Sequence, residues 1–230
     1  MTSPQQLYHL QSSLSSLFDR IGLTQEFRDD FTVIEFTPQE QDQLDLLIEK
    51  FEELIEELRN DAASIQETLD QRLLIRLGNF HYYLYKDEDR ALDYYGLSTK
   101  VEENEWAYFN SAKILAKQEY LDLAIEKYDQ AIKIKPDFPQ AFRHQAEILN
   151  RQGKSDAAFE KLQKSQELNP NDPETNKLLA DYYLAHGEKN EALYHLKAIH
   201  HRDSVVKERI EELQSKDSFF KRLSKRLRKK

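Results

Sequence analysis

Small residues recur every 34 positions in the second half of the chain, and this interval constrains the fold more than any other feature. The interval separates Ala112, Ala146 and Ala180, then Ala124, Ala158 and Ala192, and also Gly153 and Gly187. A sequence repeat of about 20 to 50 residues is one supersecondary unit that buries its apolar face against its neighbours. Small side chains let two helices approach closely, because a larger side chain would hold the backbones apart. The spacing therefore predicts helix pairs stacked along the chain.

Larger apolar residues and prolines recur beside the small ones. Leucine or tyrosine occupies the equivalent core positions, which are Leu115, Leu149, Tyr183, Tyr128, Leu162 and Leu196. Pro136 and Pro170 end predicted helices, because proline has no amide hydrogen and clashes with the preceding turn. Only 5 Gly and 6 Pro occur in 230 residues, which favours long helices over a sheet of many strands. The chain is therefore predicted to be all-α.

This pattern resembles the tetratricopeptide repeat family, in which each repeat is a pair of antiparallel helices with small residues at fixed places and a proline near the end. Residues 105–138 and 139–172 match without a gap, and residues 173–202 match except for the missing final proline. Residues 71–104 are a looser copy, because Gly78 lies 34 residues before Ala112 whereas Ala91 lies 33 before Ala124. The extra residue is predicted in the turn between the two helices. The resemblance implies a right-handed helical solenoid of about four repeats over 71–202.

An acidic extension, residues 37–70, precedes the repeats. From residue 38 to residue 70, eleven acidic residues are opposed by two basic ones, a net charge of −9. Thr37 and Glu40 have the spacing of a capping box, and residues 37–59 have the apolar spacing of an amphipathic helix. A second helix is predicted from about Ala62 to run without interruption into the first repeat. We expect the extension to cover the open end of the repeats; self-association into a homo-oligomer through 37–59 is the alternative.

Two further segments flank the repeats. Residues 1–36 contain a short predicted helix with an apolar stripe, followed by a linker over 22–36. The stripe fits docking within the chain or docking on a partner. Residues 203–216 place Val206, Ile210 and Leu213 on one helical face. They are predicted to form the capping helix that ends the array.

The resemblance implies a concave groove lined by the first helix of each repeat. The contact positions that it assigns are Arg72, Ile75, Asn79, Tyr82, Trp106, Phe109, Lys113, Arg143, Glu147, Lys177 and Asp181. The first two repeats are aromatic at these positions and the last two are polar with mixed charge. A partner segment with apolar anchors fits the first half. The alternative is that the aromatic residues pack against the N-terminal helices.

Some members of the family that act as heat-shock co-chaperones clamp a C-terminal carboxylate with two asparagines and three basic residues. Asn79 and Asn110 match the two asparagines. Ile75, Gln140 and His144 stand where that clamp has Lys or Arg, so the charge-assisted hydrogen bonds to a carboxylate are absent. The two asparagines can still bond a peptide backbone, whereas a heat-shock tail is not expected as the ligand.

The C-terminal segment, residues 217–230, is strongly basic. Seven of the ten residues from 221 to 230 are Lys or Arg and none is acidic. The candidate surface-binding residues are Phe219, Phe220, Lys221, Arg222, Leu223, Lys225, Arg226, Leu227 and Arg228. A basic amphipathic helix of this kind can rest on an anionic membrane surface. The alternatives are contact with the acidic helix of this or another chain, nucleic-acid binding and a solvated tail. The whole chain has a net charge of −9 and residues 221–230 contribute +7, so residues 1–220 carry −16. This negative charge disfavours extended nucleic-acid binding, because it repels the phosphate backbone.

No catalytic, metal or cofactor motif stands out. The chain has no cysteine, which excludes disulfides, thiol nucleophiles and cysteine-ligated metals, and it lacks a phosphate-binding glycine loop. No segment approaches the roughly 20 apolar residues that span a bilayer. We predict a cytoplasmic, non-enzymatic scaffold or adaptor, without cofactor or metal, that binds a protein or peptide and belongs to an assembly at the inner face of a membrane. A chaperone of the type III secretion kind and, more distantly, an enzyme with an unrecognised site are the alternatives.

Overall fold

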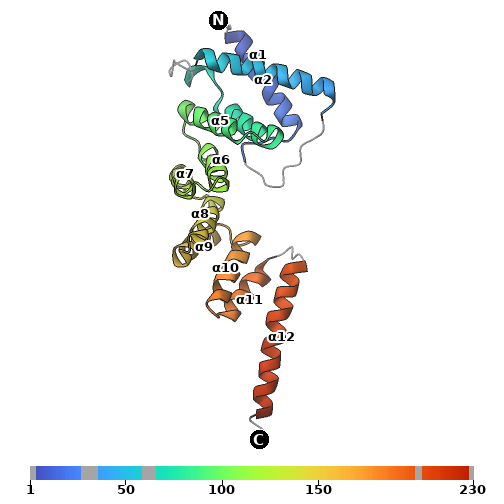
Figure 1. Cartoon of the computed structure of the whole chain (residues 1–230), viewed down its shortest axis with the longest axis vertical. Coiled ribbons are helices and arrows are strands. Elements are labelled where there is room, and N and C mark those ends of the chain that lie inside the picture. The colour runs from blue at the N-terminus through green and yellow to red at the C-terminus, as the bar shows by residue number, and fades with distance from the viewer. Residues whose placement is uncertain (1–3, 27–35, 59–65, 200–203, 228–230) are drawn as a thin grey trace. The chain divides into compact units, whose positions relative to one another are not determined.

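The computed structural model describes residues 4–26, 36–58, 66–199 and 204–227, and it describes side chains as far as Ser215. The elements formed by these residues are helices (Figure 1), which confirms the predicted all-α class. The chain divides into two compact units, unit 1 (Met1–Pro136) and unit 2 (Asp137–Lys230). Each unit has its own buried apolar residues.

Unit 1 contains the first two repeats as helix pairs. The first pair is α4 (Gln71–Phe80), continued by the π-helix η1 (His81–Tyr85), and α5 (Glu88–Val101). The second pair is α6 (Glu105–Lys117) and α7 (Leu121–Ile134). Ala91, Ala112 and Ala124, the small residues predicted between paired helices, have no exposed surface. The pairs therefore form where the 34-residue spacing predicts them.

The extra residue of the first repeat lies within the turn of η1, so its predicted place between the two helices is wrong. A residue with positive φ follows the first helix of each repeat: Lys86 at 56°, Glu119 at 67°, Gly153 at 75° and Gly187 at 78°. Glu119 lies seven residues after Ala112, but Lys86 lies eight after Gly78. The amide of Lys86 donates to the carbonyl of His81, five residues back. A π-turn of this kind holds one more residue than an α-turn, which accounts for the insertion.

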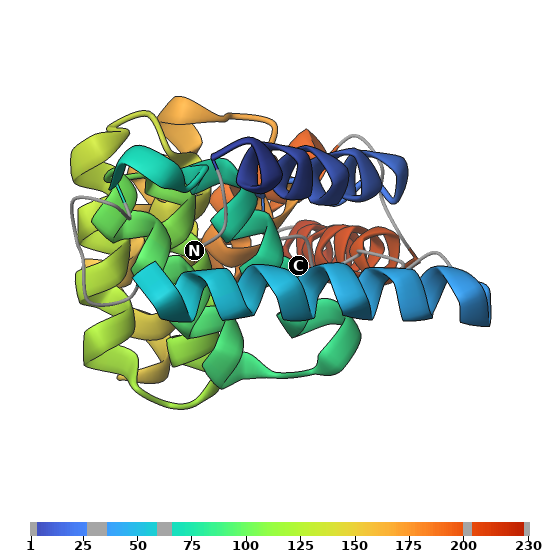
Figure 2. The same cartoon turned by 90° about the horizontal axis from the view of Figure 1, so that it is seen from above.

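Two N-terminal helices pack on the repeats of unit 1. In α1 (Pro4–Arg20), Leu14 and Phe18 are completely buried, and Phe18 stacks on Phe80 with ring centroids 5.5 Å apart. α1 contacts both α4 and α2 (Pro38–Leu58). Figures 1 and 2 show α1 and α2 from two sides. The apolar stripe of α1 is therefore docked within the chain.

The start of α2 carries the predicted capping box. The amide of Thr37 donates to the carboxylate of Glu40 at 3.0 Å, and the amide of Glu40 donates to the hydroxyl of Thr37 at 3.3 Å. Hydrogen bonds from the amide and the hydroxyl of Thr37 lower the pKa of Glu40. The Glu40 carboxylate and the Thr37 hydroxyl thus each accept from a backbone amide that the start of a helix leaves without a partner.

The predicted continuous helix from Ala62 into the first repeat is wrong. Residues 59–65 lie outside the described residues, and the chain is not helical at Leu69 and Asp70. The carboxylate of Asp70 accepts hydrogen bonds from the amides of Arg72 and Leu73 at 2.8 and 3.1 Å. Asp70 is therefore the N-cap of a new helix, a role that its short acceptor side chain favours.

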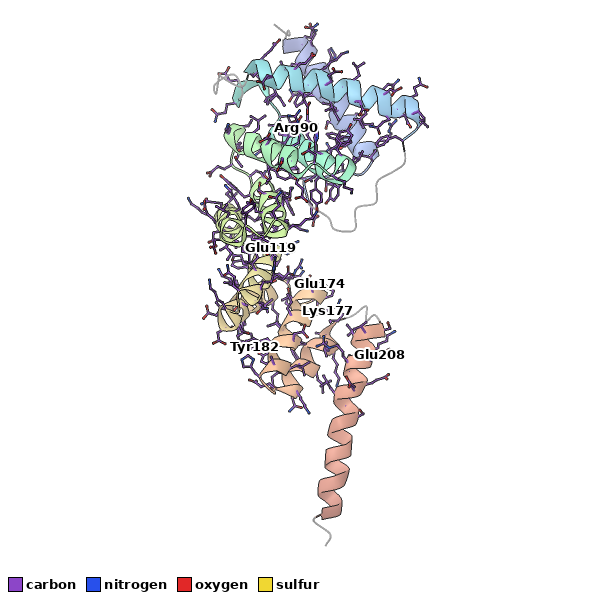
Figure 3. All side chains as sticks on the ribbon, in the orientation of Figure 1. Arg90, Glu119, Glu174, Lys177, Tyr182 and Glu208 are labelled. Atoms are coloured by element: carbon purple, nitrogen blue, oxygen red, sulfur yellow. The ribbon has the colours of Figure 1, made fainter. Side chains whose placement is uncertain are left out.

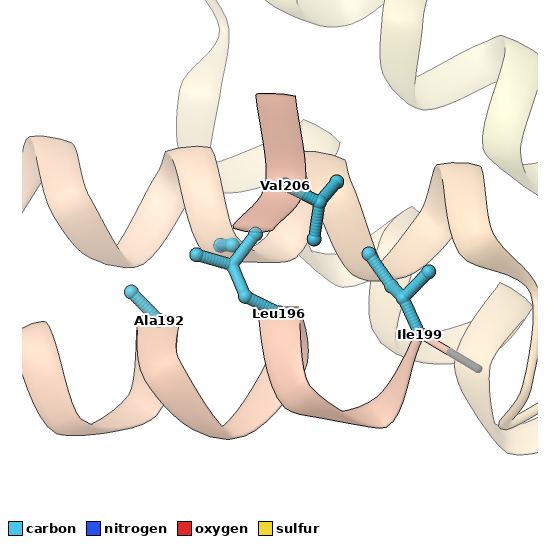
Figure 4. Close-up of a cluster of buried hydrophobic side chains, with 5 residues drawn as sticks. Ala192, Leu196, Ile199 and Val206 are labelled. Atoms are coloured by element: carbon cyan, nitrogen blue, oxygen red, sulfur yellow. The ribbon is translucent and has the colours of Figure 1, made fainter. Parts of the chain in front are cut away.

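Unit 2 contains the third and fourth repeats and a final helix. The pairs are α8 (Pro139–Arg151) with α9 (Ser155–Leu168) and α10 (Pro173–Ala185) with α11 (Lys189–Ala198). In α12 (Ser204–Leu227), Val206 joins Ala180, Ala192, Leu196 and Ile199 in a buried cluster (Figure 4). α12 is continuous across residue 216, where the sequence analysis separated a capping helix from the tail. No proline or glycine occurs after residue 203 to interrupt it.

Candidate functional site

The first helices of unit 1 carry eight predicted groove residues, and half of them are buried. Ile75, Asn79, Phe109 and Asn110 have at most 3% of their surface exposed. Tyr82, Trp106 and Lys113 are half-buried and Arg72 is exposed. The two asparagines are covered by the N-terminal segment of the same chain.

Asn79 on α4 and Asn110 on α6 hold a stretch of the chain's own backbone. The side-chain amide of Asn79 donates to the carbonyls of Thr24 and Gln25 at 2.8 and 3.1 Å. The side-chain amide of Asn110 donates to the carbonyl of Gln25 at 2.8 Å. These bonds reach the backbone alone, so the asparagine pair holds this segment of the chain without contacting its side chains through hydrogen bonds.

The asparagine pair is held in place by a third buried side chain. The side-chain carbonyl of Asn79 accepts from the amide of Asn110 at 3.0 Å and from the hydroxyl of Tyr95 at 2.6 Å. Burial raises the pKa of Tyr95 well above its usual value, so the phenol stays a donor. With its carbonyl occupied in this way, Asn79 directs its amide group toward the bound backbone.

Arg76 belongs to the same site and was not singled out by the sequence analysis. Its Nε donates to the carbonyl of Leu23 at 2.7 Å, and its other nitrogens reach the hydroxyl of Ser15 at 3.0 Å and the carboxylate of Asp19 at 2.7 Å. Only 11% of the Arg76 side chain is exposed. The sequence signal for Arg76 was a single charged residue between the apolar Ile75 and Leu77. A charge at a buried position needs partners, so it marks a polar contact.

The start of the predicted linker, residues 22–36, is part of this site. Leu23 is 2% exposed, and the backbone of residues 23–25 is bound as described. The helical periodicity had ended before this point, and binding through backbone groups leaves no pattern in the sequence. Residues 27–35 lie outside the described residues.

The aromatic groove residues of unit 1 contact one another and nearby cations. The rings of Trp106 and Phe109 meet edge to face at 5.8 Å, and the Nζ of Lys135 lies 5.7 Å from the centre of the Trp106 ring. The Nζ of Lys117 lies 5.1 Å from the centre of the Tyr82 ring. Such contacts combine dispersion with a cation–π attraction. Tyr82 and Trp106 keep part of their surface available.

The predicted groove residues on α8 are linked by charge. Arg143 lies 3.1 Å from Glu147 and 3.4 Å from Asp172, and the Nδ1 of His144 lies 2.8 Å from the Glu147 carboxylate. Burial raises the pKa of Glu147, but the hydrogen bond from His144 and the charges of His144 and Arg143 outweigh it, so the net pKa is lowered. Glu147 is therefore held as an anion.

The predicted groove residues on α10 are also paired but more exposed. Lys177 lies 2.9 Å from Glu174, and Figure 3 shows the two side chains on the same helix. Asp181 pairs with Arg209 of α12. The side chains of Lys177 and Asp181 remain 31% and 53% exposed. A charged surface on unit 2 is thus accessible to a ligand.

The predicted membrane-facing residues are not placed by the structure. The side chains of Phe219, Phe220, Lys221, Arg222, Leu223, Lys225, Arg226, Leu227 and Arg228 lie outside the described residues. Within the described ranges, no helix combines the length and the apolar character that crossing a bilayer requires. The same ranges contain no cluster of three or more potential metal-ligating side chains.

The comparison with known proteins rests on three-dimensional likeness. No protein-family model and no curated protein matches the sequence. Among solved structures, MamA superposes with a TM-score of 0.57 at 14% identity, over 82% of this chain and 89% of that one. YrrB, a TPR protein with an unusual peptide-binding site, gives 0.51 at 22% identity, over 64% and 72%. PilF of Pseudomonas aeruginosa gives 0.59 at 14% identity, over 87% and 81%. With the helix pairs at 34-residue intervals, these likenesses show that the chain has the tetratricopeptide repeat fold.

Proposed function

We propose that the chain is a non-enzymatic scaffold that binds a segment of a partner protein along the first helices of its repeats. The supporting observation is the binding of residues 23–25 by Arg76, Asn79 and Asn110. Donors on first helices thus already hold a peptide backbone in this fold. The likeness to YrrB, whose name includes a peptide-binding site, agrees with this use of the surface.

The partner's segment binds the first helices of unit 2 in this proposal, because the chain's own segment fills the asparagine site of unit 1. Arg143 and Lys177 occupy one position of successive repeats, and Glu147 and Asp181 occupy the position four residues later. A segment carrying charges of both signs matches these residues. Charge pairs of this kind contribute more to specificity and register than to affinity.

Peptides of random sequence, selected by phage display on the immobilised full chain, provide probes. Their affinities are measured by fluorescence anisotropy for the chain and its variants. Lys177→Ala and Asp181→Ala are each expected to weaken binding about tenfold, as for contact residues of intermediate strength. The matched control is Lys164→Ala, since Lys164 forms a similar i,i+3 ion pair with Glu167, at 2.8 Å, on the second helix of its repeat. Equal losses in the control and the first-helix variants would contradict the proposal.

Attachment to an anionic membrane, as a subunit of a membrane-associated assembly, is a separate part of the proposal. It rests on the basic residues 221–230, and it stays a prediction, as do the cytoplasmic location and the secretion-chaperone alternative. Flotation with phosphatidylserine vesicles, comparing the chain with a Lys221→Gln, Arg222→Gln, Lys225→Gln variant, tests the attachment. Flotation of neither protein would contradict it.

A further inference from the structure

We propose that a groove between α2 and α5 binds the basic C-terminal segment, residues 217–230, of a second copy of the chain. The groove lies within unit 1, and the proposed contact uses neither the asparagine pair nor the charged residues of α8 and α10. It therefore goes beyond the proposed peptide binding, and it competes with the proposed membrane attachment for the same basic segment. The shape of the groove, its charge and the chemistry of the segment support this contact.

The groove is large and partly apolar. Its volume is ≈ 1030 Å³, and Ile55 of α2 and Leu92 and Leu97 of α5 line it. Gly96 also lines it, and no atom lies within 4 Å of the place where a Cβ of Gly96 would stand. Ligand sites of small molecules have volumes of roughly 300 to 1,000 Å³. The groove therefore has room for several apolar side chains of an amphipathic helix.

The groove has an acidic edge. Glu53, Glu56 and Glu57 line it from α2, all exposed, and Asp93 lines it from α5. Across all the lining residues, five are acidic and two are basic. A concave surface edged by charges of one sign attracts a ligand of the opposite sign.

A carboxylate of this edge, Glu52, holds the two helices together. Glu52 of α2 accepts from Arg90 at 2.8 Å and from the hydroxyl of Tyr94 at 2.9 Å, both on α5. Figure 3 labels Arg90 on the side of α5 that faces α2. Burial, followed by the charge of Glu52 and its hydrogen bond, raises the pKa of Tyr94 above its usual range, so the phenol remains a donor. The groove is thus preformed, and Glu53, Glu57 and Asp93 add negative charge to its edge.

Residues 217–230 have the complementary chemistry. Phe219, Phe220, Leu223 and Leu227 recur at helical spacing among seven Lys and Arg residues. A basic helix with one apolar face is what an apolar groove with an acidic edge accommodates. Helix-in-groove binding of this kind uses the apolar residues as anchors and the charges to set the orientation.

The geometry of α12 favours a second copy as the source of the segment. The start of α12 packs on the core of unit 2 through Val206, Ile210 and Leu213. From Leu213 the helix continues for 14 residues to Leu227, about 21 Å at roughly 1.5 Å per residue. Figure 1 shows this end of α12 extending past α10 and α11. A helix fixed at its start holds its far end away from the core of its own unit, which suits a contact with a second copy.

Binding of this kind is head-to-tail, because each copy offers one groove and one C-terminal segment. Such heterologous contacts build open chains unless the geometry closes a ring. The association is expected to grow with protein concentration and to weaken as salt screens the charges.

The first experiment measures the contact directly. A fluorescein-labelled peptide of residues 214–230 is titrated into the full chain and followed by anisotropy. The variant Glu53→Gln, Glu57→Gln, Asp93→Asn is expected to bind it about tenfold more weakly, from three charge pairs of ordinary surface strength. The matched control, Asp42→Asn, Glu103→Gln, Glu126→Gln, changes the net charge equally at exposed residues outside the groove and is expected to bind like the parent chain. Equal binding by the two variants overturns the proposal.

Two further measurements separate the groove from other binding partners. A peptide with Phe219→Ser and Phe220→Ser keeps every charge and is expected to bind the chain several-fold more weakly, since aromatic anchors dominate such contacts; unchanged binding overturns the proposal. Sedimentation velocity of the full chain at low salt should show species larger than a monomer that the groove variant lacks. A chain that stays monomeric, with a peptide that binds phosphatidylserine vesicles and not the chain, overturns the proposal in favour of a membrane surface.

Discussion

Alanine at position 78 is expected to destabilise unit 1, although alanine occupies the equivalent position of the other three repeats. A Cβ on Gly78 would lie 2.4 Å from Cε1 and 2.7 Å from Cδ1 of Tyr95. Tyr95 is fully buried and its hydroxyl is bonded to Asn79 at 2.6 Å, so the ring has little freedom to move away. The close approach therefore requires a residue without a side chain.

The magnitude follows from two opposing effects. Replacing Gly by Ala inside a helix stabilises by about 1 kcal/mol, whereas overpacking a core costs about 1–3 kcal/mol. Because the added atom would meet the body of a buried ring, we expect a net loss of about 1–2 kcal/mol for Gly78→Ala. Gly96 is the matched control: it is exposed in α5 and has no atom within 4 Å of a built Cβ. Gly96→Ala should gain up to about 1 kcal/mol from helix propensity alone.

Urea unfolding followed by tryptophan fluorescence measures both variants. The chain has one tryptophan, Trp106, and it lies in unit 1. Gly78→Ala should unfold at lower urea and Gly96→Ala at higher urea than the parent chain. Adding Tyr95→Leu to Gly78→Ala should recover part of the loss, since leucine is the residue at the equivalent core position of the third and fourth repeats. A Gly78→Ala variant as stable as Gly96→Ala would refute the expected clash between a Cβ at position 78 and the ring of Tyr95.

Three further predictions concern unit 1. Asp70→Ala removes the acceptor that caps α4 and should lower the free energy of unfolding by about 1 kcal/mol, read from the urea midpoint; an unchanged midpoint would contradict the capping role. Burial lowers the pKa of His81, so the unfolded chain binds a proton that the folded chain excludes, and stability present above pH 6.5 is lost as the pH falls further. In His81→Phe the loss of stability at low pH should be smaller than in the parent chain, as measured by urea unfolding between about pH 5 and 8. Equal losses in the variant and the parent chain would count against this role of His81. Arg76→Met should speed amide hydrogen exchange in α1, because it removes the bonds to Ser15, Asp19 and Leu23; unaltered exchange would argue that apolar packing alone holds the helix.

The helix pairs could be predicted because their signal is local and repeated. Ala112, Ala146 and Ala180 recur every 34 residues and are all fully buried. The position of the extra residue could not be predicted in the same way. Counting residues between Gly78 and Ala91 shows an insertion, but a longer turn and a π-turn have the same count, and only backbone hydrogen bonding distinguishes them.

The two asparagines could be singled out, but not what they bind. Asn79 and Asn110 match a family pattern at first-helix positions, and the structure brings them within 3.0 Å of each other. Their ligand within the chain, the backbone of Thr24 and Gln25, lies 54 or more residues away in sequence. Backbone groups are the same in every residue, so no residue type marked that segment. Arg76 was missed partly for the same reason, because its Nε donates to the backbone carbonyl of Leu23.

The succession of helix pairs thus follows from residue size and spacing, because each pair depends on side chains that are near one another in sequence. What covers the first helices of unit 1 depends on contacts between α1, residues 23–25 and α4, which are distant in sequence and partly made by backbone groups. The groove between α2 and α5 arises in the same way, from the ion pair of Glu52 with Arg90 across 38 residues. Long-range contacts of this kind exist only once the chain has folded, and they determine which of the predicted surfaces remain open to a partner.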